Sequence, residues 1–199
     1  MTNKILHELK EHIPYTLFAT FIAMIITLAG YWINRQGFIS QTTSLFYIFH
    51  PAHIFFSAIV STAIFYKYKN KIFPAIAVGF IVSIFMGSLS DVIFPYIGGI
   101  IFNLDTSFHL PIIENTLLIS VFAIAGCIFG VFKFTKIPHF LHVFLSVFAS
   151  LMYLLAYSIQ INILIFILIS IIVFVSVVLP CCLGDIVFPL IFEKIRRKE

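Results

Sequence analysis

Charged side chains are what this sequence lacks most. Only 10% of its 199 residues are charged, whereas 61% are hydrophobic. So few charged side chains cannot cover the surface of a soluble domain of this size, and the composition therefore predicts an integral membrane protein. A basic patch interleaved with exposed aromatic residues is also missing, which argues against nucleic-acid binding.

The signatures of several enzyme classes are absent as well. The chain has no Gly-rich phosphate loop, nucleophile elbow or kinase motif. Its three cysteines, Cys127, Cys181 and Cys182, form no Cys-x-x-Cys pair, and adjacent cysteines seldom bridge each other. These residues predict no repeated thiol chemistry, and soft-metal binding in the second half of the chain stays open.

Apolar stretches long enough to cross a bilayer, about 20 residues each, dominate what is present. We expect an all-α, polytopic membrane protein with six transmembrane helices at about 13–34, 45–66, 72–98, 111–132, 138–158 and 160–192. Pro95 and Pro180 are expected to break the third and sixth helices. Basic residues gather on one side of these stretches, which places both termini in the cytoplasm. We expect the chain in the plasma membrane of a prokaryote.

An internal sequence repeat is the strongest signal in the sequence. The block His50-Pro-Ala-His53-Ile-Phe-Phe-Ser57-Ala-Ile-Val-Ser61 returns at the same spacing as His139-Phe-Leu-His142-Val-Phe-Leu-Ser146-Val-Phe-Ala-Ser150. Likewise, Asp91-Val-Ile-Phe-Pro95 returns as Asp185-Ile-Val-Phe-Pro189. Because rare polar residues match in order and spacing, we predict a duplication. Three spans per copy make the copies inverted: residues 1–104 with a short cytoplasmic N-terminal segment, and residues 105–199 with a basic cytoplasmic tail.

The repeated His and Ser residues fall on one stripe of a helix, and the acids fall in predicted spans that contain no Lys or Arg. Ionisable groups inside a membrane are costly and usually face a cavity, a partner or a pathway. Imidazole with carboxylate suits Zn, Fe, Mn, Co or Ni better than Ca or Mg. We predict divalent transition-metal ligands at His50, His53 and Asp91 and at the mirror set His139, His142 and Asp185, with accessory candidates at His12, His109, Glu114, Ser57 and Ser146.

These features favour a small membrane transporter for a divalent transition-metal cation, coupled to protons through His and Asp. An intramembrane metal-dependent hydrolase is one alternative. A metal-free solute carrier, or the membrane subunit of a larger transporter, is another, and in both of these readings the histidines line a pocket or fix helix packing. The expected partners are the lipid bilayer and a metal ion or small solute, with a homo-oligomer as an option. Whether the two ligand sets form one site or two stations along a path stays open.

Overall fold

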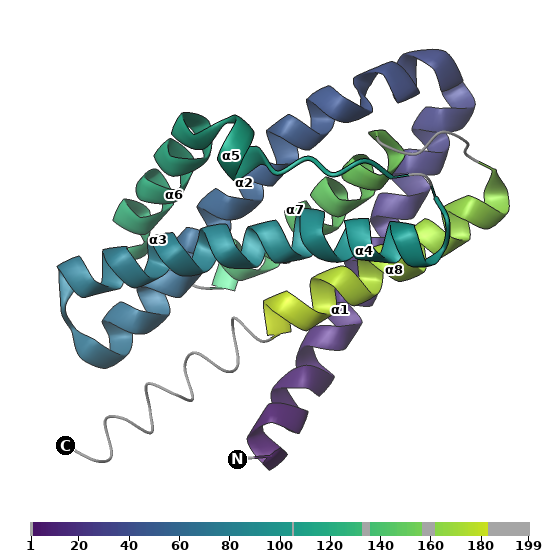
Figure 1. Cartoon of the computed structure of the whole chain (residues 1–199). Coiled ribbons are helices and arrows are strands. Elements are labelled where there is room, and N and C mark those ends of the chain that lie inside the picture. Colours follow the sequence, from purple (N-terminus) through teal and green to yellow (C-terminus); the bar gives the residue numbers. More distant parts are fainter. Residues whose placement is uncertain (1, 105, 133–135, 157–161, 183–199) are drawn as a thin grey trace.

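A computed structural model describes residues 2–104, 106–132, 136–156 and 162–182. These ranges contain helices and no strand, which confirms the all-α prediction for this part of the chain. Figure 1 shows the helices in chain order: α1 (Thr2–Ile33), α2 (Arg35–Lys69), α3 (Ile72–Ser88), the π-helical turn η1 (Leu89–Ile93), α4 (Phe94–Ile101), α5 (Pro111–Glu114), α6 (Thr116–Gly130), α7 (Lys136–Ala156) and α8 (Ile163–Cys182).

Three stretches of helix are long and apolar enough to cross a membrane: Arg35–Lys67, Ile72–Ile101 and Ile163–Pro180. Three shorter apolar helices accompany them, at Leu17–Ile33, Thr116–Gly130 and Phe140–Ala156. The chain is therefore built as expected of a membrane protein. Helices occur at each of the six stretches picked out by the apolar pattern, and six crossings stay a prediction.

The expected break at Pro95 takes a different form. The third stretch continues past this proline to the end of α4, and a π-helical turn replaces the break. Such a turn is one way in which a helix accommodates a proline, which has no N–H to donate to the preceding turn. Pro180 lies inside α8 near its described end, and the remainder of the predicted sixth span lies outside the described residues.

Local caps explain why α2 is so long and begins so soon after α1. The side chain of Asn34 accepts a hydrogen bond from the Gly37 N–H at 3.0 Å, which caps the first turn. At the other end, Asn70 adopts the left-handed conformation, with a φ of 48°, and its N–H donates to the Tyr66 carbonyl. One asparagine at each end thus defines a single helix.

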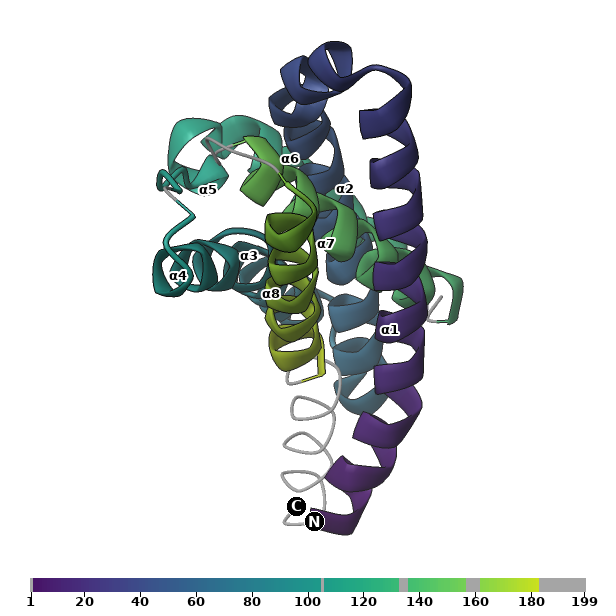
Figure 2. The same cartoon turned by 90° about the vertical axis from the view of Figure 1, so that its right-hand side faces the viewer.

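The helices α2 and α7 form the central pair of the bundle. Helix α2 also packs against α3 and α6, and α7 packs against α1, α8 and η1. Every residue of α7 from Ser146 to Leu155 is buried, which is typical of a helix surrounded by others. Figure 2 shows α1 along one edge of the bundle and α4 and α5 at the other. The centre of the molecule is therefore the interface between the two helices that carry the repeated motif.

Glycines allow α6 to pack closely against α2, on the side of α2 that faces away from α7. A Cβ atom on Gly126 would lie 2.2 Å from the Phe55 carbonyl oxygen, and one on Gly130 would lie 2.7 Å from the Ile59 carbonyl oxygen. Both neighbours are backbone atoms, so a side chain at either position would push the helices apart. Small residues permit this close approach in membrane helices. Helix α2 is thus held between α6 and α7.

Candidate functional site

Asp91 lies in the π-helical turn between α3 and α4. Within this turn the N–H of Phe94 donates to the Leu89 carbonyl, one residue further back than in an α-helix. Pro95 has no N–H, so position 95 supplies no donor to the carbonyl of Ser90 or of Asp91. The local sequence thus places a widened turn, a form often found at functional sites, at the residue that bears the acid.

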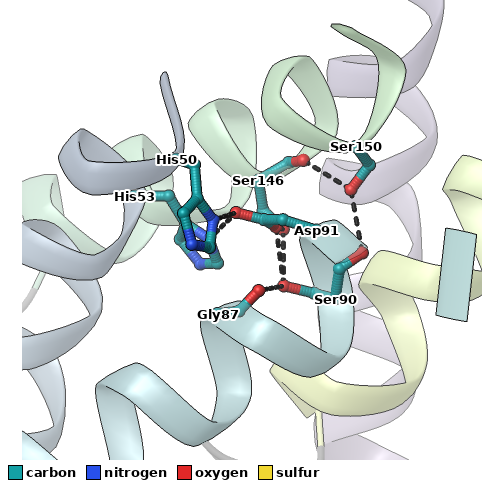
Figure 3. Close-up of polar contacts among 7 residues, drawn as sticks. All are labelled: His50, His53, Gly87, Ser90, Asp91, Ser146 and Ser150. Carbon is teal, nitrogen blue, oxygen red and sulfur yellow. Dashed lines mark hydrogen bonds and ion pairs between the residues drawn. The ribbon is translucent and has the colours of Figure 1, made fainter. Parts of the chain in front are cut away.

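One oxygen of Asp91 is bound by both histidines of the first motif. The Nδ1 atoms of His50 and His53 each lie 2.8 Å from Asp91 Oδ2. The two imidazoles reach the same oxygen because a spacing of three residues places them on one face of α2. Figure 3 shows the carboxylate between the imidazoles of α2 and the serines of α7.

The other oxygen of Asp91 is bound by two hydroxyl groups. The Oγ atoms of Ser90 and Ser146 each lie 2.7 Å from Asp91 Oδ1. The Oγ atom of Ser150, one turn further along α7, lies 2.9 Å from the Ser90 carbonyl oxygen and 2.8 Å from the Ser146 carbonyl oxygen, and its one proton is shared between them (Figure 3). Ser150 therefore satisfies a carbonyl that Pro95 leaves without a donor, and it ties α7 to the π-helical turn.

This cluster of His50, His53, Ser90, Asp91, Ser146 and Ser150, the central cluster, is sealed from solvent. The side chains of His50 and Asp91 are 0% exposed, and that of His53 is 1% exposed. Lys and Arg occur in the described membrane-length stretches only at their ends. A buried carboxylate with two neutral imidazoles would carry an uncompensated negative charge, which is costly. A proton on the carboxyl group, a proton on an imidazole or a bound cation would each remove that charge.

The second motif faces the first across the α2–α7 interface. The rings of His53 and His142 lie 5.3 Å apart between centroids, at an interplanar angle of 37°. Further along, Phe49 contacts Phe148 and Phe46 contacts Tyr153. Rising numbers on α2 pair with falling numbers on α7, so the two helices are antiparallel. The described part of the second stripe therefore meets the first stripe at the centre of the bundle.

A second, outer cluster contains two of the accessory candidates. The hydroxyl of Tyr47 donates to Glu114 Oε2 at 2.6 Å, and His109 Nδ1 lies 3.1 Å from Glu114 Oε1. The bond from Tyr47, with a further contribution from His109, holds the pKa of the Glu114 carboxyl below its usual range, although partial burial opposes this effect. Tyr47 lies one turn before His50 on α2, and Glu114 does not contact Asp91. The outer cluster is thus separate from the central one.

The remaining predicted residues are only partly described. Ser57 is buried on α2, one turn after His53. His12 lies in α1 and His139 in α7, but their side chains are outside the described residues, as is all of Asp185. The mirror set therefore stays a prediction.

Sequence reasoning missed Ser90 as a site residue and gave no role to Ser150. Ser90 is not part of the repeated pattern, because the equivalent position in the second copy is Gly184. Ser150 does belong to the repeated stripe, and its position one turn after Ser146 could have marked it as a neighbour of the same acid. Tyr47 could have been found in the same way, as it lies three residues before His50 on the same face of α2.

Both oxygens of Asp91 are hydrogen-bonded, whereas Nε2 of His50 has no hydrogen-bond partner among the described residues. Within the described ranges, no group of three or more His, Cys, Asp or Glu side chains is arranged to hold a metal ion. The 2.8 Å separations between the imidazole nitrogens and Asp91 Oδ2 are those of hydrogen bonds, whereas ligands about 2.0–2.2 Å from one shared metal lie somewhat further apart. Imidazole nitrogen and carboxylate oxygen are nevertheless ligand types that transition metals accept.

No protein-family model, curated protein or solved structure matches the chain. Its function must be argued from the composition of the helices and the geometry of the central cluster. Both observations concern the same region, because the cluster lies where α2, η1 and α7 meet.

Proposed function

We propose that this chain is a small integral-membrane carrier for a divalent transition-metal cation, which it exchanges for protons at Asp91. The observation that carries the proposal is the burial of one carboxylate, with two imidazoles, among apolar helices that lack internal basic residues. Intramembrane ionisable residues of this kind mark ion pathways and proton relays. Zn, Fe, Mn, Co and Ni are the candidate ions, since they accept imidazole nitrogen with carboxylate oxygen.

Exchange at this site follows from its chemistry. Imidazoles bind metal only through a deprotonated nitrogen, and metal binding therefore releases protons. The nitrogens that would bind the ion are the Nδ1 atoms of His50 and His53, which now contact Asp91 Oδ2. If both imidazoles are protonated beside the Asp91 carboxylate, binding of one divalent ion with release of both protons leaves the charge of the buried cluster unchanged. Histidine suits this exchange because it gains and loses protons near neutral pH.

The packing supports two inverted repeats, residues 1–104 and 105–199, with six membrane crossings. His53 and His142 are equivalent positions of the repeated motif, and their rings face each other. Equivalent residues contact each other where a two-fold axis passes between them. In the two repeats α1, α2 and α3 correspond to α6, α7 and α8. Each contact has its counterpart under this correspondence: the α2–α3 contact matches α7–α8, α2–α6 matches α7–α1, and α3–α6 matches α8–α1. Inverted repeats around a central site are an arrangement of secondary transporters.

The same symmetry predicts the surroundings of the second acid. Ser57 is the counterpart of Ser146, so Asp185 should meet His139, His142 and Ser57 as Asp91 meets its own partners. With this symmetry and six crossings, both termini face the cytoplasm, where basic residues concentrate. The proposal thus includes two related acids near one axis, in the plasma membrane of a prokaryote.

Uptake into proteoliposomes tests the proposal. Purified protein should carry at least one of the five candidate ions into vesicles, with protons moving in the opposite direction, as a pH-sensitive dye in the lumen would report. The change Asp91→Asn should reduce uptake to the level of empty vesicles. Glu114→Gln, which removes the carboxylate of the outer cluster, is the matched control and should keep most of the activity. No uptake of any candidate ion by the wild-type protein, or normal uptake by Asp91→Asn, would contradict the proposal.

A further inference from the structure

The two oxygens of Asp91 have different neighbours. Oδ2 faces the imidazoles of His50 and His53, whereas Oδ1 accepts hydrogen bonds from Ser90 and Ser146. Both serines are fully buried, so water does not compete for these bonds. A carboxylate held in this way offers one oxygen to a cation on the imidazole side.

The serine hydroxyls are committed to Oδ1. Each hydroxyl has one proton to donate, and the contacts with Oδ1, at 2.7 Å, are the shortest that either group makes. Ser90 Oγ lies 3.4 Å from the Gly87 carbonyl oxygen, and the two hydroxyl oxygens lie 3.1 Å apart. Bonds to a charged acceptor are also stronger than bonds to neutral groups. Both protons are therefore best assigned to Asp91.

Building on the proposed function, we propose that Ser90 and Ser146 are positioning residues that determine which cation the site accepts. By occupying Oδ1 they make Asp91 bind through Oδ2 alone, and this selects ions that accept few ligands, such as Zn²⁺ and Co²⁺. Ions that favour more oxygen ligands, such as Mn²⁺, gain from a carboxylate that binds through both oxygens. To do so here, Asp91 would have to give up both serine bonds.

The two serines come from different helices, so the arrangement depends on how these helices pack. Ser90 is next to Asp91 in the π-helical turn, whereas Ser146 comes from α7, in the other predicted repeat. Ser146 can hold Oδ1 only while α7 is packed against η1, and Ser150 secures that contact through the Ser90 carbonyl. Selectivity is thus a property of the packed interface between the two halves.

Competition between Co²⁺ and Mn²⁺ tests this inference on the purified full-length chain in nanodiscs. We compare the wild type with Ser146→Ala, with the double change Ser90→Ala and Ser146→Ala, and with Ser146→Thr, which keeps a hydroxyl. The matched control is Ser83→Ala, since Ser83 is also fully buried but, among the described residues, its hydroxyl bonds to the Phe80 carbonyl in the same helix alone. The readouts are the ratio of the two affinities and the visible absorption of bound Co²⁺, which weakens as the coordination number rises.

In the double variant, the affinity for Mn²⁺ relative to Co²⁺ should rise about tenfold or more, in line with the effect of removing a group that orients a metal ligand. The absorption of Co²⁺ should weaken at the same time. Ser146→Ala should show a smaller change of the same sign, and it serves alone if the double variant does not fold. Ser146→Thr and Ser83→Ala should resemble the wild type.

Two results would overturn the inference, and they can be told apart. If the alanine variants bind metal with the wild-type affinity ratio and Co²⁺ spectrum, the serines do not set selectivity, and the proposed carrier function is unaffected. If the wild-type protein binds no divalent metal, the proposed function itself fails and the selectivity role fails with it.

Discussion

The central and outer clusters use the same chemistry on one helix and differ in their access to water. In both, a carboxylate meets imidazole Nδ1 and a hydroxyl group, and α2 supplies part of each cluster. Asp91 is 0% exposed, whereas the side chain of Glu114 is 34% exposed. Water screens the outer carboxylate, so its charge needs no fixed partner. The side chain of Asp91 has no such screening, and its hydrogen bonds come from buried neighbouring side chains.

The two clusters also differ in what their contacts connect. The outer cluster joins the segment before α6 to α2 through Tyr47 and Glu114. Tyr153 joins the same segment to α7, because its hydroxyl donates to the Ser107 carbonyl at 2.9 Å. These contacts hold a connection across the central pair of helices. The inner contacts instead surround one buried acid where α2, η1 and α7 meet.

The largest expected difference between the clusters is in stability. Asp91→Ala should destabilise the protein by about 3 kcal/mol or more, because two imidazoles and two serine hydroxyls lose their buried acceptor. Glu114→Ala should cost less than about 1 kcal/mol, since water replaces the lost bonds. Unfolding curves in detergent measure both values. Equal losses would mean that burial does not distinguish the two clusters.

Metal affinity should separate the histidines in the same way. His53→Ala removes a proposed ligand and should weaken binding of Zn²⁺ or Co²⁺ about a hundredfold, at the upper end of the effect known for changes around metal sites. His109→Ala alters only the outer cluster and should leave the affinity within about twofold. Titration calorimetry on both variants gives the comparison. A strong effect of His109→Ala would make the outer cluster part of the binding site.

A smaller effect is expected from Ser150, which supports the central cluster without contacting the acid. Ser150→Ala leaves the Ser90 carbonyl without this donor and should destabilise the protein by about 1–3 kcal/mol. Ser170→Ala is the control, because within the described part of the chain that hydroxyl bonds to the Phe166 carbonyl of its own helix alone. Thermal unfolding of the two variants, side by side, measures the difference. Identical midpoints would show that the bond to the π-helical turn adds nothing.

The smallest effect concerns the response of the outer cluster to pH. Because the pKa of Glu114 is lowered in the folded protein, its ionised form adds stability at neutral pH, and this contribution is lost as the pH falls through the lowered pKa. Wild-type protein should exceed Glu114→Gln in stability by less than about 1 kcal/mol at neutral pH, with no difference in acid. Unfolding midpoints across this range test the sign. A gap that widens in acid would contradict the assignment.

The sequence predicted much of the central cluster through its internal repeat. Matched spacing singled out His50, His53 and Asp91 as neighbours, and it identified Ser146 as an accessory candidate. The contact of Ser90 with Asp91 could not be foreseen, because it depends on a π-helical turn. Pro95 did not predict this turn, since a proline at that position is equally compatible with a break in the helix. The outer bond between Tyr47 and Glu114 also escaped prediction, since it joins residues 67 positions apart without a repeated pattern.

By itself, the sequence determined that the chain is helical, apolar and built around a repeated set of His, Ser and Asp. Composition and spacing along a helix carry this information, because both act locally. Only the tertiary structure decided that Asp91 turns one oxygen to the histidines of α2 and the other to a serine of α7. The orientation of this carboxylate depends on the packing of α2, η1 and α7 against one another. Because the carboxylate is buried away from water, its hydrogen-bond donors must come from these packed helices.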